Sequence, residues 1–197
     1  MTVLFHGSFG LNRAYMSGLL TQALAQTSST DKQLAQSFDY GAPFAAKYRS
    51  WLHKCGVSEM GLPMKLTPFG EVVYNNDPEF KTLTTQWFLH HELVTDAERS
   101  EAWHFFALEF LPKHSTFTKE ELLMGLTEKL RSHSEQHFGP GSKLNKTILN
   151  KIIEVYTGAN GLGQLGLIKP EGGHFVRLKP KTLGPWKTVE ALSKAYR

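Results

Sequence analysis

The sequence predicts a mainly α-helical protein, with a winged helix-turn-helix unit at each end of the chain and a helical segment between them. Three observations support this fold class. Residues 11–55 contain three amphipathic segments with helix start and stop signals. Residues 80–111 hold two apolar, aromatic-rich segments at helical spacing. Residues 144–178 indicate one further helix that is followed by a hairpin.

The first winged unit is expected over residues 1–76. Its first helix covers about 11–26, where leucine and alanine recur at helical spacing. Thr30-Asp31-Lys32-Gln33 is a capping-box pattern that starts a second, short helix. Pro43 suits the first position of a third helix, and Gly56 ends it. Three helices in this order are typical of a helix-turn-helix domain.

The wing of this unit is expected directly after the third helix. Thr67–Gly70 indicates a turn, and the apolar run Glu71–Tyr74 indicates the strand that follows it. The third helix is then the recognition helix, because one face is apolar and the other is small and basic, as suits a helix that enters a major groove. The alternative is an ordinary solvated face. The polar face consists of Ala46, Lys47, Arg49, Ser50, His53 and Lys54.

The middle segment, residues 77–139, is expected to be helical. Asp77 can cap a helix that Pro78 begins and that runs to about Val94. A second buried helix covers Trp103–Leu111, and Thr118 with Glu121 forms the capping box of a third. This aromatic density is more typical of a core than of a ligand site.

The second winged unit is expected over residues 140–197, after a break at His137–Gly141. Its main helix covers Leu144–Tyr156, with the apolar residues on one face and lysines towards the other. Glu171–His174 forms the tip of a hairpin, and Phe175–Leu178 is the returning strand. The hairpin is rich in lysine and arginine, so it is a second candidate wing.

Charge is distributed unevenly along the 197 residues, whose net charge is +4. Residues 1–76 carry +2, residues 77–139 carry −5 and residues 140–197 carry +7. Basic ends around an acidic middle favour nucleic acid at the ends, with an uneven but inert surface as the alternative. A single cysteine excludes an internal disulfide and suits a reducing cytoplasm. The absence of a long apolar run or a secretory signal predicts a cytoplasmic protein with no membrane contact.

Motifs for catalysis are weak, and we expect no enzyme activity, no cofactor and no metal. Gly161–Gly166 matches the dinucleotide-binding pattern, but a helix precedes it where that fold requires a strand. His90-His91-Glu92 lacks the second histidine four residues on that a helical zinc site needs. His6–Gly10 lacks the glycine two residues before the serine of a nucleophile elbow.

Four collinear stretches resemble the bacterial family known as Domain of Unknown Function 4007. They are Phe5–Leu24, Tyr40–Val57, Leu66–Leu93 and Leu162–Ile168, and they span most of the chain. Gly41-Ala42-Pro43-Phe44 departs from the family, which has a Lys-Asn pair there. The resemblance implies a DNA-handling accessory role near sulfur-based DNA modification and phage defence. It implies no established activity and no catalytic residues.

We therefore expect a DNA-binding accessory protein of a bacterial DNA-modification or phage-defence system, which contacts double-stranded DNA through basic winged-helix surfaces. The alternative is a protein-protein adaptor that scaffolds a DNA-modifying, sulfur-transfer enzyme complex without binding DNA. Protein partners from the same gene cluster are expected in either case. The candidate DNA-binding residues are Lys47, Arg49, Ser50, His53, Lys54, Lys65, Lys146, Asn150, Lys151, Arg177, Lys179 and Lys181.

Overall fold

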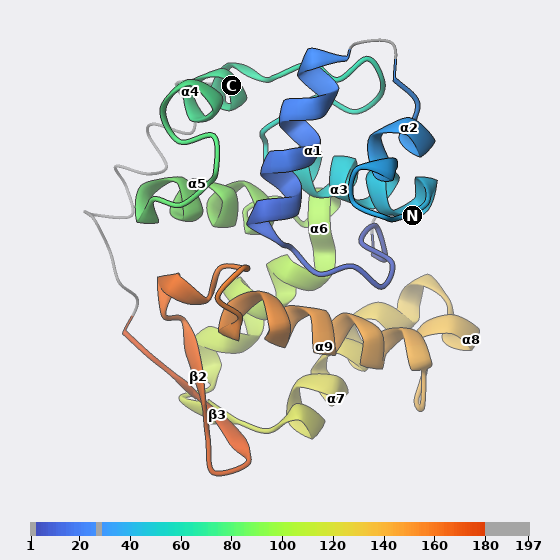
Figure 1. Cartoon of the computed structure of the whole chain (residues 1–197). Coiled ribbons are helices and arrows are strands. Elements are labelled where there is room, and N and C mark those ends of the chain that lie inside the picture. Colours follow the sequence, from blue (N-terminus) through green and yellow to red (C-terminus); the bar gives the residue numbers. More distant parts are fainter. Residues whose placement is uncertain (1–2, 27–28, 180–197) are drawn as a thin grey trace. The chain divides into compact units, whose positions relative to one another are not determined.

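The computed structural model describes residues 3–26 and 29–179, and it is mainly helical (Figure 1). The predicted mainly α fold is therefore confirmed. Contacts within the chain divide it into two compact units. We call residues 5–93 the N-terminal unit and residues 94–179 the C-terminal unit. These two units differ from the three segments that the sequence suggested.

The N-terminal unit consists of helices, whose starts follow local signals. Asn12 accepts hydrogen bonds from the backbone N–H groups of Ala14 and Tyr15, and the capping box between Thr30 and Gln33 is formed as predicted. Pro43 lies in the first turn of the third helix. The helices are α1 (Arg13–Ala25), α2 (Asp31–Gln36), α3 (Ala42–Lys54), α4 (Pro68–Asn76) and α5 (Leu83–Val94).

Helix α3 lies at the centre of this unit and packs against α1 and α2. It buries Phe44, Tyr48 and Trp51 almost completely. The Tyr48 hydroxyl donates to the carbonyl of Gly10 at 3.0 Å, and the Trp51 indole N–H donates to the carbonyl of Phe9 at 3.1 Å. These bonds satisfy the polar tips of two buried aromatic side chains. They also tie the segment before α1 to α3.

The predicted wing strand at Glu71–Tyr74 is wrong, because residues 68–76 form helix α4. Thr67 accepts from the N–H of Gly70 and so caps this helix, and Pro68 occupies its first turn. A Thr-Pro pair can start a turn or a helix, and here the apolar residues that follow pack at helical spacing. The polypeptide before α4 forms one isolated bridge, between Ser58 and Leu66.

The predicted helix start at Asp77 and Pro78 is also wrong. Asp77 does accept backbone hydrogen bonds, from Lys81 at 2.9 Å and Thr82 at 2.8 Å, but these close a turn before the helix. Phe80 is fully buried and has a left-handed backbone conformation, with φ of 54°, which breaks any helix at this position. Helix α5 therefore begins at Leu83.

The C-terminal unit combines helices with a small sheet. The expected helix Trp103–Leu111 is the end of one α-helix followed by a turn of π-helix and a turn of 3-10 helix. The main elements are α6 (Ala97–His104), the π-helix η1 (Phe105–Phe110), the 3-10 helix η2 (Leu111–Lys113), β1 (Thr116–Phe117), α7 (Lys119–Leu130), η3 (Arg131–His133), α8 (Glu135–Phe138), α9 (Lys143–Thr157), η4 (Gly163–Leu165), β2 (Ile168–Glu171) and β3 (His174–Arg177).

The three strands form an antiparallel sheet in the order β1-β3-β2. Phe117 pairs with Phe175, and Glu171 pairs with His174 next to the turn. The turn residues Gly172 and Gly173 both have positive φ, which a tight hairpin of this kind requires. The predicted hairpin is confirmed, as is the capping box that starts α7 at Thr118.

Residues on the two sides of Gly139 pack within the same unit. Helix α9 lies against α7, and the buried side chain of Asn145 joins them. Its amide donates to the carbonyl of Phe138 at 2.6 Å and to the hydroxyl of Thr127 at 3.0 Å. The break predicted at residues 137–141 is thus a tight connection between α8 and α9.

Candidate nucleic-acid interface

Helix α9 begins with a strong local signal and has one buried face. The Ser142 hydroxyl accepts from the N–H groups of Leu144 and Asn145, at 3.1 and 3.2 Å. The buried face includes Ile148, Ile152 and Tyr156, and the ring of Tyr156 stacks on Phe106 at 5.2 Å. This packing orients the helix, so its remaining face is presented to solvent.

The exposed face of α9 is a narrow stripe. At 3.6 residues per turn, its members fall within an arc of about 80°. They are Lys143, Lys146, Asn150, Glu154 and Thr157. The first two turns of the stripe are basic. In the third turn Lys151, which is half-buried, forms an ion pair with Glu154 at 2.6 Å. Positive charge is therefore concentrated at the N-terminal half of α9.

The β2–β3 hairpin carries the other predicted basic residues. Lys179 is exposed just beyond β3. Arg177 donates to the carbonyl oxygens of Leu111 at 3.0 Å and Pro112 at 2.8 Å, which ties the hairpin to the 3-10 helix η2. Lys181 lies outside the described residues. Arg177 and Lys179 are therefore both exposed cations, and Arg177 makes its two internal hydrogen bonds through a single guanidinium nitrogen, Nη1.

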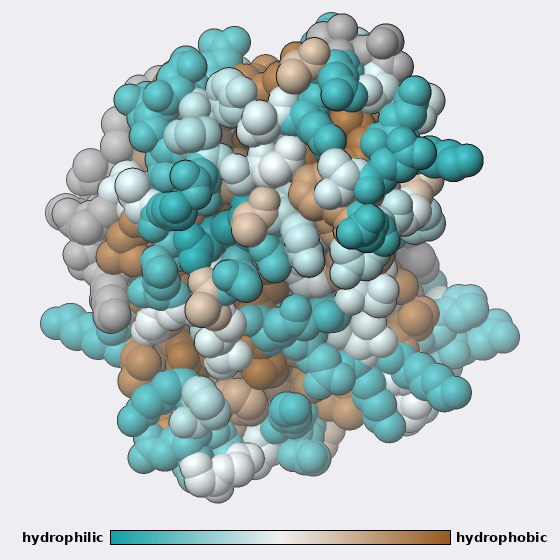
Figure 2. Space-filling view, in the orientation of Figure 1, coloured by the Kyte–Doolittle hydropathy of each residue, from teal (hydrophilic) through white to brown (hydrophobic). Residues whose placement is uncertain are grey.

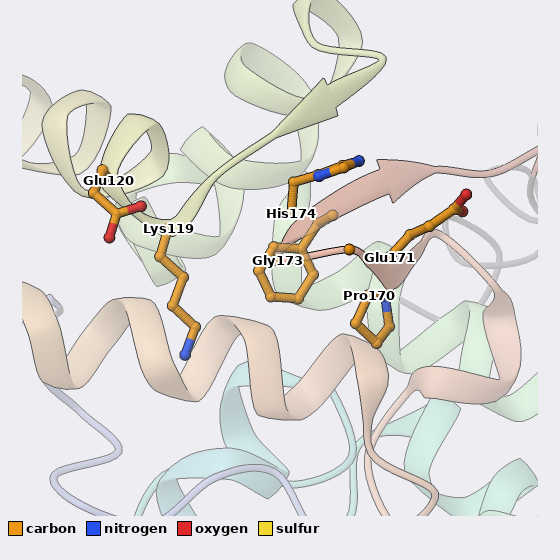
Figure 3. Close-up of a pocket in the computed structure, with 8 residues that line it drawn as sticks. Lys119, Glu120, Pro170, Glu171, Gly173 and His174 are labelled. Carbon is orange, nitrogen blue, oxygen red and sulfur yellow. The ribbon is translucent and has the colours of Figure 1, made fainter.

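A shallow hollow of about 380 Å³ lies beside the hairpin (Figure 3). Lys119 and Glu120, from the first turn of α7, form one side, and Pro170 and Gly173 form the other. A hydrogen bond from Lys169 holds the pKa of Glu171, at the hairpin tip, below its ordinary value. The hollow is lined by both Lys119 and Glu120, so its charge is mixed and does not define a site for an anion or a cation. It lies between the hairpin and the first turn of α7.

The predicted recognition residues of α3 have internal roles. The Arg49 guanidinium donates to both carboxylate oxygens of Asp31 at 2.7 Å, and these side chains are 16% and 22% exposed. The hydroxyl of Ser50 donates to the carbonyl of Ala46, within the helix. Lys54 is 7% exposed, and its ammonium lies 5.8 Å from the centroid of the Phe5 ring. These groups serve the fold of the N-terminal unit.

The other candidate residues in this unit differ in their exposure to solvent. His53 donates through Nδ1 to the carbonyl of Ser58 at 3.2 Å. Lys47 is half-buried, with its aliphatic chain beside Gly7, and Lys65 is exposed. The structure thus brings Lys146, Asn150 and Lys151 together on one helix of the other unit but does not assemble an equivalent surface on α3. Lys143 lies on the predicted polar face of this helix but is missing from the candidate DNA-binding residues, although its position three residues before Lys146 indicates the same face.

The remaining motifs have structural explanations. Gly161 lies where a side chain would overlap the carbonyl oxygen of Val155, so this glycine allows a tight turn after α9. In the described ranges, no three His, Cys, Asp or Glu side chains are grouped so that they could hold a metal ion. None of the helices described is both long enough and apolar enough to cross a membrane.

Comparison with known proteins identifies the family. The family model described as "Protein of unknown function (DUF4007)" matches residues 8–174. The chain belongs to this family. The resemblance found in the sequence is therefore confirmed, and the comparison establishes no activity for the family. A search of curated proteins finds no match.

Two solved structures of SspB have a similar fold. This member of the DUF4007 family matches the "SspB crystal structure" with a TM-score of 0.70 and the "Magnesium ion-bound SspB crystal structure" with a TM-score of 0.65. Each match has 14% sequence identity and covers 92% of this chain but 61% of the SspB chain. At this identity the likeness concerns the fold alone.

Proposed function

We propose that this protein is a DNA-binding accessory protein that contacts duplex DNA through its C-terminal unit. The order of elements supports a winged helix: α6, β1, α7, α9 and a β2–β3 hairpin, with the sheet order β1-β3-β2. In such a domain the last helix enters the major groove and the hairpin is the wing. The observation that carries the proposal is the exposed stripe on α9, with its basic N-terminal half.

The dimensions and charges of α9 suit this role. A helix with its side chains is about 10–12 Å across, and the major groove of B-DNA is about 12 Å wide. Lys143 and Lys146 would neutralise phosphates at the groove edge, and Lys179 would do so beside the hairpin. Lys151 would exchange Glu154 for a phosphate, because the Glu154 side chain is 54% exposed and an ion pair open to solvent contributes only about 0–1 kcal/mol. No catalytic step is part of the proposal.

We place the protein in a bacterial DNA-modification or phage-defence system in the cytoplasm. This part of the proposal rests on the family resemblance, which is an argument by analogy. Lys47 and Lys65 of the N-terminal unit would then make no contact with the DNA. Arg49 and Lys54 would stabilise that unit.

Duplex binding at rising salt tests the proposal. Fluorescence anisotropy with a labelled duplex should show that log affinity falls with log salt by about 0.9 for each phosphate contact. Changing Lys146 to Ala should lower this slope by about 0.9, which is the value for one phosphate contact. Changing Lys32 to Ala, at an exposed site in the N-terminal unit, should leave it unchanged. Binding that is absent, or that does not respond to salt, contradicts the proposal.

A second candidate is a protein-protein adaptor that does not bind DNA. Met124 on α7 is 73% exposed and Leu108 on the π-helix is 45% exposed. Apolar side chains with this exposure suit a protein contact. Glu120, Glu121 and Glu128 lie one turn away from Met124 on α7, so the surface suits a basic partner.

Co-expression with the products of neighbouring genes separates the two candidates. An adaptor would co-purify with one such product, and Met124→Glu would abolish the complex. The matched control is Met60→Glu, since Met60 is also exposed but lies in the N-terminal unit. A complex that forms while the protein shifts no DNA favours the adaptor over the DNA-binding protein.

A further inference from the structure

The exposed stripe of α9 has a single uncharged amide at its centre. At about 100° per residue, Lys146 and Glu154 define the two edges of the stripe, and Asn150 lies midway between them. A side chain at the centre of a helix face extends furthest towards the floor of a groove. The flanking residues are closer to the groove edges, where the phosphates lie.

Neighbouring side chains lack the combination of donor and acceptor that matches the edge of an adenine. Lys143 and Lys146 carry ammonium groups, which donate hydrogen bonds but cannot accept them, so they suit phosphate oxygens or the two acceptors of guanine. The hydroxyl of Thr147 already donates to the carbonyl of Lys143 at 3.0 Å, and Lys151 is paired with Glu154. Asn150 has both a donor and an acceptor, and its amide makes no hydrogen bond with any described residue.

A second asparagine on the same helix shows the contrast. Asn145 is fully buried, and its amide bonds to Phe138 and Thr127. Asparagine has a low helix propensity, so two asparagines in a 15-residue helix each call for a reason. Packing between α7 and α9 supplies the reason for Asn145. Asn150 is exposed and has no hydrogen-bond partner within residues 3–26 and 29–179, so we take recognition as its reason.

We infer that Asn150 reads the major-groove edge of an adenine, so that α9 recognises duplex DNA with a preference for adenine at one position. The inference rests on the proposed function. The Oδ1 atom of Asn150 accepts a hydrogen bond from the adenine N6 amino group, and its Nδ2 amino group donates one to adenine N7. The lysines beside it bind phosphates and carry no sequence information.

Selection from a randomised duplex library tests the inference, with the wild type and three variants. Wild type should prefer adenine at one position by about five- to a hundredfold. Asn150→Ala should lose that preference. Asn150→Asp retains an acceptor but no donor, so its preference at the same position should change to cytosine, whose N4 amino group donates. Lys146→Ala should weaken binding to all sequences and keep the preference for adenine.

The outcomes separate this inference from the proposed function. If the wild-type protein binds no duplex, the proposed function and the inference both fail. Duplex binding with no adenine preference, or with a preference that Asn150→Ala and Asn150→Asp both retain, overturns the inference alone. Because Asn150 is exposed, the variants should keep the wild-type thermal unfolding curve, which verifies that they are folded.

Discussion

Helices α3 and α9 share a pattern of apolar and basic residues but have different environments. Each has 13 to 15 residues, an apolar face and several basic side chains on the other face, so the sequence suggested the same role for both. In α3 the guanidinium of Arg49 is held by Asp31, and Lys54 is buried. In α9 Lys143 and Lys146 are exposed. A basic helix face indicates a ligand only when its charges have no partner inside the fold.

The difference arises from what surrounds each helix. Helix α3 packs against both α1 and α2, and the first turn of α2 brings the Asp31 carboxylate to Arg49. Helix α9 packs against α7 and the strand β2, and the side chains on its opposite face are exposed to solvent. Hydrophilic side chains cover much of the molecular surface in the view of Figure 2. Four variants or conditions test this contrast.

The largest effect is expected for Gly70→Ala, which tests whether the N-terminal unit lacks a wing. A methyl group at Gly70 would overlap the carbonyl oxygen of Val57, because α4 begins against that segment. We expect the free energy of unfolding to fall by about 3 kcal/mol or more. Chemical denaturation measures this change.

The control for this variant is Gly41→Ala at the N-cap of α3, where the added methyl meets only ordinary contacts. It should cost less than about 1 kcal/mol. If Gly70→Ala is equally mild, residues 68–76 do not form a helix against Val57, and a wing in this unit becomes possible again.

The next effect contrasts two residues of the same type on α9. Asn145→Ala removes a buried hydrogen bond to Phe138 and a part-buried one to Thr127, and it leaves the Phe138 carbonyl without this donor, so it should cost about 2 kcal/mol. Asn150→Ala should change stability by less than about 0.5 kcal/mol. Equal unfolding midpoints for the two variants would show that α9 is not anchored to α7 in this way.

Acid should destabilise the N-terminal unit through His90. Burial, assisted by the nearby His91, lowers the pKa of His90 to about 3. The unfolded chain binds a proton below about pH 6.5 that folded His90 does not bind, so stability is lost as pH falls from 6.5 towards 3. The free energy of unfolding should fall by about 1.4 kcal/mol per pH unit, which amounts to about 2 kcal/mol between pH 6.5 and pH 5.

Denaturation from pH 8 to 4 checks this expectation. His90→Gln should flatten the slope, whereas His137→Gln, at an exposed site in the other unit, should not change it. A wild-type protein whose stability does not vary between pH 6.5 and 5 would mean that His90 is not buried as a neutral group.

The smallest of these effects is expected for Arg49→Ala. Loss of the bidentate pair leaves Asp31 without its cation in a mostly buried position, so stability should fall by about 1–2 kcal/mol. DNA affinity should stay within twofold of wild type. Stability that does not change, together with weaker DNA binding, would show that Arg49 contacts the ligand after all.

Local signals were sufficient to predict much of the fold. The capping boxes at Thr30 and Thr118 and the Gly172-Gly173 hairpin involve residues within a few positions of one another, so their chemistry is visible in the sequence. Helix α4 was missed because Thr67-Pro68 is compatible with two local structures. The packing against Val57 decides between them, and this contact joins residues that are distant in the chain.

The same reason limits prediction of the candidate site. The stripe on α9 follows from the helical period, which is a local property. The guanidinium of Arg49 pairs with Asp31, which is 18 positions away in the sequence. The guanidinium of Arg177 donates to carbonyl groups that are 65 and 66 positions away. No spacing rule relates such pairs, so sequence reasoning cannot distinguish a structural arginine from one that binds a ligand.

The most direct test is a charge reversal in each helix, Lys146→Glu in α9 and Lys47→Glu in α3, measured by duplex anisotropy across a salt series. We expect Lys146→Glu to weaken binding at least tenfold and to lower the salt slope by about 0.9 or more, while Lys47→Glu stays within twofold of wild type. The reverse ranking, or equal losses for both variants, would contradict this expectation.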